Sequence, residues 1–148
     1  MPQYRHTQRS LLLVLFLLPP VAGLVALAYF MPELRWVLGL VAVGLLVSLA
    51  LFYQLTIEIT DKELRWAFGV GLVRKQVPLA EIASAEAGHS RWYHGWGIHY
   101  TGFGWLYNVE GFDVVKVGLK SGSHFALGTD EPAQLEAAIR SAVTGSSA

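Results

Sequence analysis

The sequence predicts a pair of membrane-spanning helices followed by a small, mainly-β domain that ends in a single helix. Two uncharged apolar runs occupy the first third of the chain, at residues 11–31 and 36–55. Alternation of apolar and polar residues begins at Thr56, and apolar residues at helical spacing close the chain. Run length and the period of alternation are the primary signals of secondary structure in a sequence.

Each apolar run is long enough to cross a bilayer, because about 20 apolar residues span the hydrocarbon core. Pro19 and Pro20 interrupt the first run, which a membrane helix tolerates when neighbouring groups satisfy the freed carbonyls. Only residues 32–35 separate the two runs. We therefore expect transmembrane helices at 11–31 and 36–55, joined as an antiparallel hairpin by a short external loop at 32–35.

Basic residues flank the hairpin at its open end. Arg5 and Arg9 precede the first run, and Lys62 and Arg65 follow the second, whereas the connecting loop has one Arg and one Glu. Cytoplasmic flanks of membrane helices are enriched in Lys and Arg. We therefore expect a multi-pass protein of the inner membrane, with a cytoplasmic N-terminus at residues 1–10 and a cytoplasmic C-terminus.

Two other interpretations of the apolar runs stay open. The first run also fits a cleaved signal peptide, with a small-residue cleavage site at Ala26-Leu27-Ala28. Its length, its two prolines and the second run directly after it favour a membrane anchor. A pore or transporter is disfavoured, because neither run contains the ionisable residue that such a pathway usually needs.

Residues 56–144 are expected to form one domain. Period-two alternation, as in Thr56–Thr60, predicts half-buried antiparallel strands. After them, Thr129 or Asp130 can cap a helix at 130–143, and Pro132 suits its first turn. The sequence has no strand–helix–strand repeat, which argues against a parallel nucleotide-binding sheet. A short tail at 145–148 completes the chain.

Composition excludes several classes of function. The chain has no Cys, which rules out disulfides, thiolate metal sites and Cys nucleophiles. Its net charge is zero at pH 7, whereas a nucleic-acid-binding domain needs a basic surface. Acidic residues outnumber basic ones from Thr56 onward. No cofactor and no nucleic acid are expected.

From Leu55 the chain resembles the pleckstrin-homology-like domains of short, membrane-anchored bacterial proteins. The resemblance rests on the segments ITDKELRWAFG, VPLAEIASAEA, GWGIHYT and GFDVVKVGLKSGSHFALGTDEP. It is sharpest at Gly128-Thr129-Asp130 with Pro132. The resemblance implies a curved antiparallel sandwich or partial barrel of about seven strands, capped by one C-terminal helix. It also implies a binding module, and it supplies no catalytic residues.

Eukaryotic members of that family often bind inositol phosphates through a Lys and Arg cluster in the first hairpin loop. Here the corresponding hairpin has only Asp61-Lys62, with Arg65 nearby, so the sequence argues against phosphoinositide binding. Four basic residues are nevertheless expected to lie close to the bilayer, because the first strands leave the membrane directly. These membrane-proximal residues are Lys62, Arg65, Arg74 and Lys75.

The stretch RWYHGWGIHYTGFGWLYN is the main candidate for a functional segment. Alternation predicts that Trp96, Ile98 and Tyr100 fill the core of a glycine-bent hairpin, with Trp105 and Tyr107 on the matching face. Before it, a loop of Arg91, Trp92, Tyr93 and His94 has the residue types of an interaction surface. The same loop also fits a cover over the open end of the domain, and both interpretations stay open.

His89, His94 and His99 recur at a spacing of five. In an extended chain this spacing places successive side chains on opposite faces, whereas zinc needs three convergent ligands. No metal site is therefore predicted, although His99 joins Arg91–His94 among the candidate binding residues. A serine hydrolase is also disfavoured, because no Gly-x-Ser-x-Gly motif is present.

The expected function is that of a membrane-anchored, non-catalytic binding or scaffolding module. It would recognise a protein partner or a lipid, or self-associate. Two alternatives remain: a structural subunit of a larger membrane complex, and a His-dependent metal-binding accessory protein.

Overall fold

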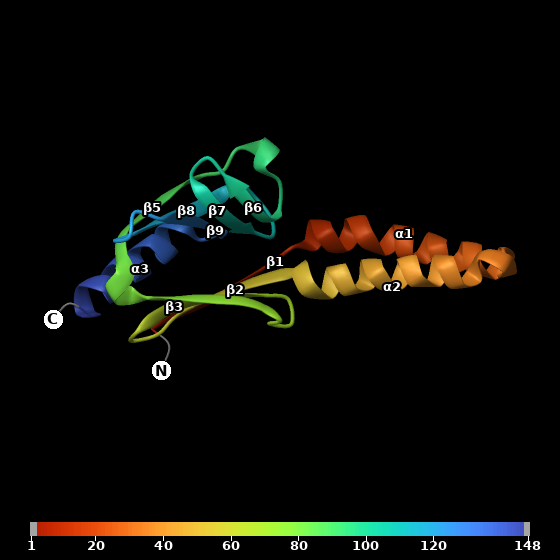
Figure 1. Ribbon diagram of the computed structural model, residues 1–148, viewed down its shortest axis with the longest axis horizontal. Helices are drawn as coiled ribbons and strands as arrows, with labels where there is room; N and C mark the ends of the chain where they lie inside the picture. Colours follow the sequence, from red (N-terminus) through yellow and green to blue (C-terminus); the bar gives the residue numbers. More distant parts are fainter. Residues whose placement is uncertain (1–2, 147–148) are drawn as a thin grey trace.

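A helical hairpin extends from a two-sheet β domain in the computed structural model, which describes residues 3–146 (Figure 1). The hairpin consists of α1 (Leu11–Phe30) and α2 (Arg35–Phe52), joined by a single 3-10 turn at Pro32–Leu34. Most of their side chains are exposed, and both helices are long and apolar enough to cross a membrane. The two predicted N-terminal apolar helices are therefore confirmed.

The domain contains two sheets, named A and B. Sheet A has the order β1-β2-β3-β4 and comprises β1 (Tyr4–Arg9), β2 (Gln54–Ile59), β3 (Glu63–Phe68) and β4 (Val73–Pro78). Sheet B has the order β5-β8-β9-β7-β6 and comprises β5 (Ile82–His89), β6 (Gly97–Thr101), β7 (Gly104–Asn108), β8 (Asp113–Leu119) and β9 (His124–Gly128). A single helix, α3 (Pro132–Ser146), follows β9. The predicted mainly-β domain with a C-terminal helix is therefore confirmed.

The sheets differ in two respects from the expected antiparallel arrangement of about seven strands. Nine strands occur within residues 3–146, and they form two open sheets without a closed barrel. One pair, β7 with β9, is parallel. The reason is topological: β9 folds back antiparallel to β8 and occupies the place between β8 and β7. Local alternation cannot reveal which strand fills that place.

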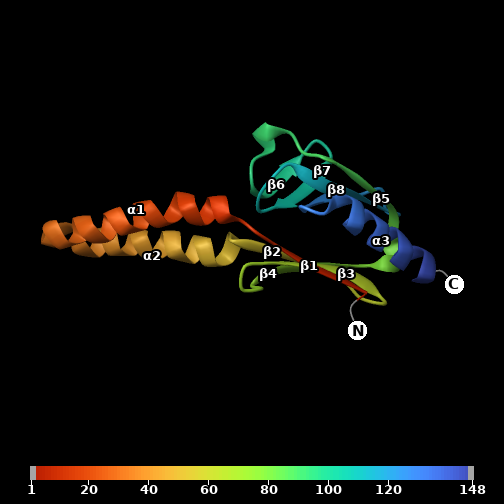
Figure 2. The same cartoon turned by 180° about the vertical axis from the view of Figure 1, so that it is seen from behind.

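The first strand, β1, was not expected from the sequence. Its six residues, YRHTQR, are mostly polar and show no apolar alternation. They pair antiparallel with β2 over the full strand, from Tyr4 opposite Ile59 to Arg9 opposite Gln54. The ladder continues one step further, where the Ser10 amide donates to the Tyr53 carbonyl at 2.7 Å. Both ends of the helical hairpin are thus joined to neighbouring, paired strands (Figure 2).

The core lies between the two sheets and beneath α3. Trp66 of sheet A stacks on Phe125 of sheet B with ring centroids 4.8 Å apart, and it lies 5.2 Å from Tyr107. Leu135 and Ile139 of α3 are fully buried, and burying each such side chain stabilises the fold by about 1.5–3 kcal/mol. α3 extends to Ser146, so part of the segment expected as a tail is helical. Residues 147–148 of that tail lie outside the described residues.

The inward-facing side of β1 is polar and ties the N-terminal segment to the start of α3. His6 Nε2 lies 2.5 Å from Asp130 Oδ1, and His6 Nδ1 lies 3.3 Å from Glu131 Oε2. Gln8 is buried and donates to the Glu110 carbonyl at 2.9 Å. Burial, together with the carboxylates of Glu131 and Asp130, raises the pKa of Tyr4 to about 12. These contacts hold β1 against the segment that leads into α3 and against the loop between β7 and β8.

A disulfide tests the register of β1 on β2, because the chain has no native Cys. Thr7 and Thr56 are paired across the ladder and their hydroxyl oxygens lie 2.9 Å apart, which suits the Cβ separation of about 3.5–4.5 Å that a disulfide needs. The double variant Thr7→Cys with Thr56→Cys should therefore crosslink under mild oxidation. Intact mass before and after reduction measures the yield.

The matched control moves one cysteine by two residues, as Arg5→Cys with Thr56→Cys. That pair is diagonal across the ladder, with an expected separation of about 7–8 Å, and should crosslink poorly. Equal yields from the two pairs would contradict the pairing of β1 with β2.

Candidate binding site

The loop after β5 is a compact unit built from its own side chains. Arg91 Nη1 donates to the Tyr93 hydroxyl at 2.6 Å, and its guanidinium lies 5.8 Å from the Tyr93 ring centre. The His94 amide donates to the Arg91 carbonyl at 2.9 Å, which closes a 3-10 turn over Trp92–His94. Trp92 is 80% exposed. The loop therefore presents aromatic side chains outward instead of burying them in the domain.

A hollow of about 330 Å³ lies beneath this loop, against the face of sheet B that points away from sheet A. We call it the outer groove. Its floor consists of Leu106, Val114 and Ala126, which form a small apolar cluster separate from the main core. The complete lining is His89, Ser90, Arg91, Tyr93, His94, Thr101, Gly102, Phe103, Leu106, Val114, Lys116 and Ala126.

The ionisable side chains that line the outer groove include two cations, Arg91 and Lys116, and two histidines, and no carboxylate. The Lys116 ammonium lies 5.1 Å from the centre of the Phe103 ring. Glu86 is its cross-strand neighbour, yet no ion pair joins the two side chains. His89 Nδ1 lies 2.6 Å from Asp113 Oδ1, so its charge is partly offset when it is protonated. Arg91 and Lys116 therefore give the groove its positive charge.

Ser90 adds a polar group without a partner. Its side-chain oxygen is buried and makes no hydrogen bond in the described part of the chain, although its amide donates to the Phe112 carbonyl at 2.7 Å. A buried polar atom without a partner costs free energy. A ligand in the groove that hydrogen-bonds to Ser90 would recover that energy. No serine hydroxyl within residues 3–146 shares a hydrogen bond with a histidine ring.

The chemistry of the outer groove suits a ligand that joins an anionic group to an apolar body. Cationic and hydroxyl donors favour a carboxylate or a phosphate, and the apolar floor favours an aliphatic or aromatic part. Among the predicted binding residues, Arg91, Tyr93 and His94 line the groove, whereas Trp92 is exposed in the same turn and is not part of the lining. Ser90, Phe103 and Lys116 were missed. The only signal for Lys116 was a single cation within a valine-rich strand.

The three histidines at a spacing of five do not converge on one point. His89 and His94 both line the outer groove, whereas the His99 ring contacts the Trp96 carbonyl oxygen. His124 is separate again, with its ring 5.2 Å from Phe103. No group of three or more His, Asp or Glu side chains in residues 3–146 is arranged to hold a metal ion.

The expectation that Trp96, Ile98 and Tyr100 form core was wrong for the two aromatics. Trp96 is 43% exposed and Tyr100 is 74% exposed, while Ile98 packs at the edge of the core. The reason is that β6 is the edge strand of sheet B, and the two sheets diverge toward the helices (Figure 1). Tyr107 is buried as expected, but Trp105 is 47% exposed.

The four basic residues expected near the membrane do not form one cluster. Arg74 is the second residue of β4 and follows the β3–β4 turn, whose Gly69 lies against the last residues of α2. Lys62 lies in the opposite β2–β3 turn, and Arg65 is ion-paired with Glu63. Lys75 points toward sheet B, with its ammonium 6.0 Å from the Trp105 ring centre and 5.7 Å from that of Tyr107. Strand alternation separates Lys75 from Arg74.

No family model, curated protein or solved structure matches the chain. Function is therefore inferred from the geometry of this fold.

Replacing Lys75 tests its interaction with the exposed edge of the sandwich. The variant Lys75→Met keeps most of the alkyl chain and removes the cation over Trp105 and Tyr107. We expect the free energy of unfolding to fall by about 0.5–1 kcal/mol, the usual size of a cation–π interaction at a partly exposed site. Lys62→Met is the matched control and should leave stability unchanged. Urea unfolding of the detergent-solubilised protein, followed by near-ultraviolet circular dichroism, measures both.

Proposed function

We propose that the protein is a membrane-anchored, non-catalytic binding module whose outer groove recognises a protein partner. The observation that carries this proposal is the continuous β1–β2 ladder, which joins both ends of an exposed apolar hairpin to the domain without a linker. The domain is thereby held at a fixed orientation beside the membrane. In this proposal the hairpin crosses the inner membrane and both termini are cytoplasmic.

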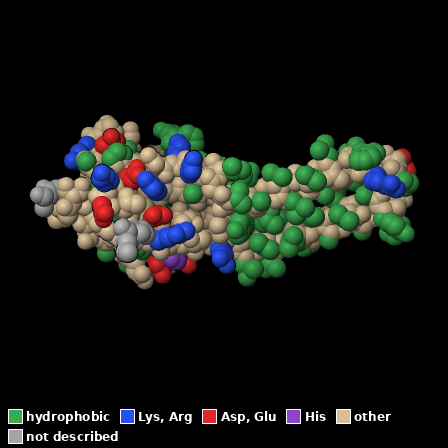
Figure 3. Space-filling view, turned by 90° about the horizontal axis from the view of Figure 1, so that it is seen from below, with side chains coloured by type: hydrophobic (Ala, Val, Ile, Leu, Met, Phe, Trp, Pro, Cys, Tyr) green, Lys and Arg blue, Asp and Glu red, His purple; other side chains and the backbone are tan. Residues whose placement is uncertain are grey.

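The surface of the hairpin supports membrane anchorage. Apolar side chains cover both helices in a continuous band, while charged side chains gather on the domain and at the far turn (Figure 3). Trp36 and Tyr29 are exposed near that far turn, where aromatic residues typically meet the second membrane interface. Signal-peptide cleavage would separate β1 from the sheet, which favours a retained anchor over a signal peptide.

A pleckstrin-homology-like domain remains our proposal for the fold family. Two facing sheets with a C-terminal helix packed on β5 and β8 support it. The additional strand β1 and the parallel pairing of β7 with β9 are particular features of this chain. The outer groove is then the binding site of the module, in place of a basic first hairpin.

A protein partner is favoured over a lipid by the composition and direction of the groove. Arg91 and Tyr93 line the groove and the exposed Trp92 belongs to the same loop; these three residue types are enriched among interface residues that dominate binding energy. The outer face of sheet B also points sideways relative to the helix axes, not along them (Figure 1). In a partner segment with acidic and apolar residues, the apolar side chains would cover the floor and the carboxylates would pair with Arg91 and Lys116.

Cysteine accessibility tests the anchorage and its orientation. Single cysteines at Glu33→Cys, in the turn between the helices, and at Ser121→Cys, in the β8–β9 turn, are treated with a membrane-impermeant maleimide. In intact bacterial spheroplasts the Glu33→Cys protein should be labelled, and the Ser121→Cys protein only after lysis. Labelling of Ser121→Cys in intact cells, or extraction of the protein by alkaline carbonate, would contradict the proposal.

Site-specific photo-crosslinking tests the outer groove. A photoreactive phenylalanine analogue in place of Trp92 or Phe103 should give one discrete adduct with another protein in native membranes. The charge reversal Lys116→Glu should abolish the adduct, because it removes the main unpaired cation of the groove. Mass spectrometry identifies the adduct.

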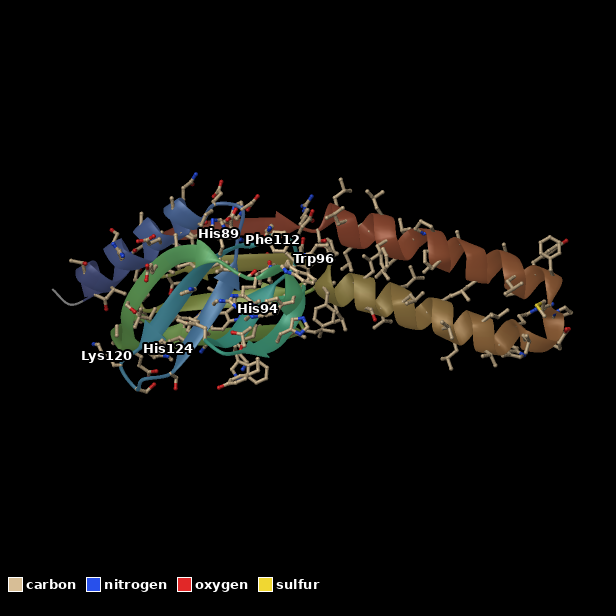
Figure 4. All side chains as sticks on the ribbon, turned by 90° about the horizontal axis from the view of Figure 1, so that it is seen from above. His89, His94, Trp96, Phe112, Lys120 and His124 are labelled. Atoms are coloured by element: carbon tan, nitrogen blue, oxygen red, sulfur yellow. The ribbon has the colours of Figure 1, made fainter. Side chains whose placement is uncertain are left out.

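The matched control for charge reversal is Lys120→Glu, at the far end of β8 and outside the groove (Figure 4). It should leave crosslinking intact. An adduct of twice the protein mass would indicate self-association, and an adduct with lipid alone would indicate lipid recognition. Either result, or equal loss with Lys116→Glu and Lys120→Glu, would overturn the assignment of the groove to a protein partner.

A further inference from the structure

The end of the domain that faces the helices carries exposed apolar side chains on two separate elements. One element is the turn between β3 and β4, where Val70 is 66% exposed and Leu72 is 76% exposed. The other is the approach to β6, where Trp96 is partly exposed beside the hairpin (Figure 4). We call Val70, Leu72 and Trp96 the collar. The core accounts for none of these side chains.

The β3–β4 turn is fixed at the level of the last turn of α2. Gly69 has a positive φ of 51°, and a Cβ at this position would lie 2.1 Å from the Ala50 carbonyl oxygen. The Gly69 amide also donates to the Gln54 carbonyl at 2.8 Å. Only glycine fits this close approach. The turn therefore cannot move away from the helix end without breaking these contacts, and Val70 and Leu72 stay beside it.

Trp96 occupies the corresponding level on the sheet B side. It lines a mainly apolar hollow of about 330 Å³ between β6 and the helices. Leu13 and Leu17 of α1 and Phe52 of α2 form the opposite wall of this hollow. These residues lie within the first two turns of α1 and the last turn of α2. A helix of 20 residues is about 30 Å long, which equals the thickness of the hydrocarbon core. The collar therefore coincides with the near interface of a bilayer spanned by the hairpin.

On the outer face of sheet A, the two cross-strand rows nearest the helices contain basic residues and no carboxylate. The cross-strand row next to the helices contains Arg9 and Gln54, and the following row contains Thr7, Thr56, Ala67 and Arg74. The first carboxylate on this face, Glu58, appears one row further from the helices, between Arg5 and Arg65. Neither Arg9 nor Arg74 forms an ion pair within the described residues. Glu110 is not on this face: it lies on the β7–β8 loop, where its carbonyl accepts from the inward-facing Gln8.

We propose that the collar, with Arg9 and Arg74 behind it, seats the domain directly on an anionic lipid surface. Val70, Leu72 and Trp96 enter the interfacial region, where aromatic and aliphatic side chains replace water, and the two arginines bind lipid phosphates. The domain is then held against the bilayer at two points on opposite sides of the hairpin. This inference rests on the proposed membrane anchorage of α1 and α2.

Fluorescence quenching tests the collar in the full chain reconstituted into vesicles of phosphatidylcholine and phosphatidylglycerol. An environment-sensitive nitrobenzoxadiazole label is attached to one cysteine at a time: Val70→Cys in the collar, Val41→Cys within α2, and Ser121→Cys in the distant β8–β9 turn. The label at 70 should emit further to the blue than the label at 121, because it enters the membrane interface, and lipids with a nitroxide at a shallow position should quench it. Lipids with a deep nitroxide should quench the label at 41, and neither should quench the label at 121.

The three sites separate this inference from the anchorage on which it rests. Quenching at 41 with no quenching at 70 would overturn the collar and leave the anchor intact. Absence of quenching at 41 would overturn both. The additional change Leu72→Asp should reduce quenching at 70 without affecting 41, which excludes an effect of the label alone.

The contribution of Arg9 and Arg74 to the binding of anionic lipid is tested with the same quenching measurement. Arg9→Gln with Arg74→Gln should remove the dependence of quenching at 70 on phosphatidylglycerol, whereas Lys62→Gln with Lys120→Gln, at the opposite end of the domain, should not. An equal dependence in the two double variants would contradict a role for Arg9 and Arg74.

Discussion

The pairing of β1 with β2 is the constraint on which the rest of the structure depends. A chain that left the domain through two free linkers could place its helices at any angle. Here the ladder between Arg9 and Gln54 passes directly into the helices, and Ser10 both continues the ladder and caps α1 through its hydroxyl, which accepts from the Leu13 amide at 3.1 Å. Because that cap is almost fully buried, the hairpin and the domain behave as one body.

This rigid junction gives the surfaces of the domain different roles. Sheet A ends beside the helices, so its β3–β4 turn lies at a fixed height. Both faces of sheet B carry apolar side chains, as β8 illustrates. Val115 and Val117 pack in the core between the sheets, while Val114 forms part of the floor of the outer groove. The groove is thus built on a strand that is anchored from its other side, which holds the positions of Lys116 and Val114.

Part of this arrangement follows from local patterns. Apolar runs of sufficient length predicted α1 and α2, alternation predicted most strands from β2 onward, and helical spacing predicted the buried stripe of α3. The Arg91–His94 loop was recognised from its composition. Alternation failed at β6, because it assumes that one face of every strand is covered. Trp96 and Tyr100 have the correct alternation, but they lie on an edge strand where the sheets diverge.

The sequence by itself determined the three long helices and most strands from β2 onward, and its lack of Cys rules out disulfides and thiolate metal sites. Tertiary structure alone decided that β1 belongs to sheet A, that β9 lies between β8 and β7, and that Ser90 and Lys116 line the same groove. The physical reason is the range of the interactions. Helical and strand periodicities involve neighbours a few residues apart, whereas the β1–β2 pairing joins residues on either side of the 40-odd residues of the helical hairpin, and nothing in YRHTQR marks that partner in advance.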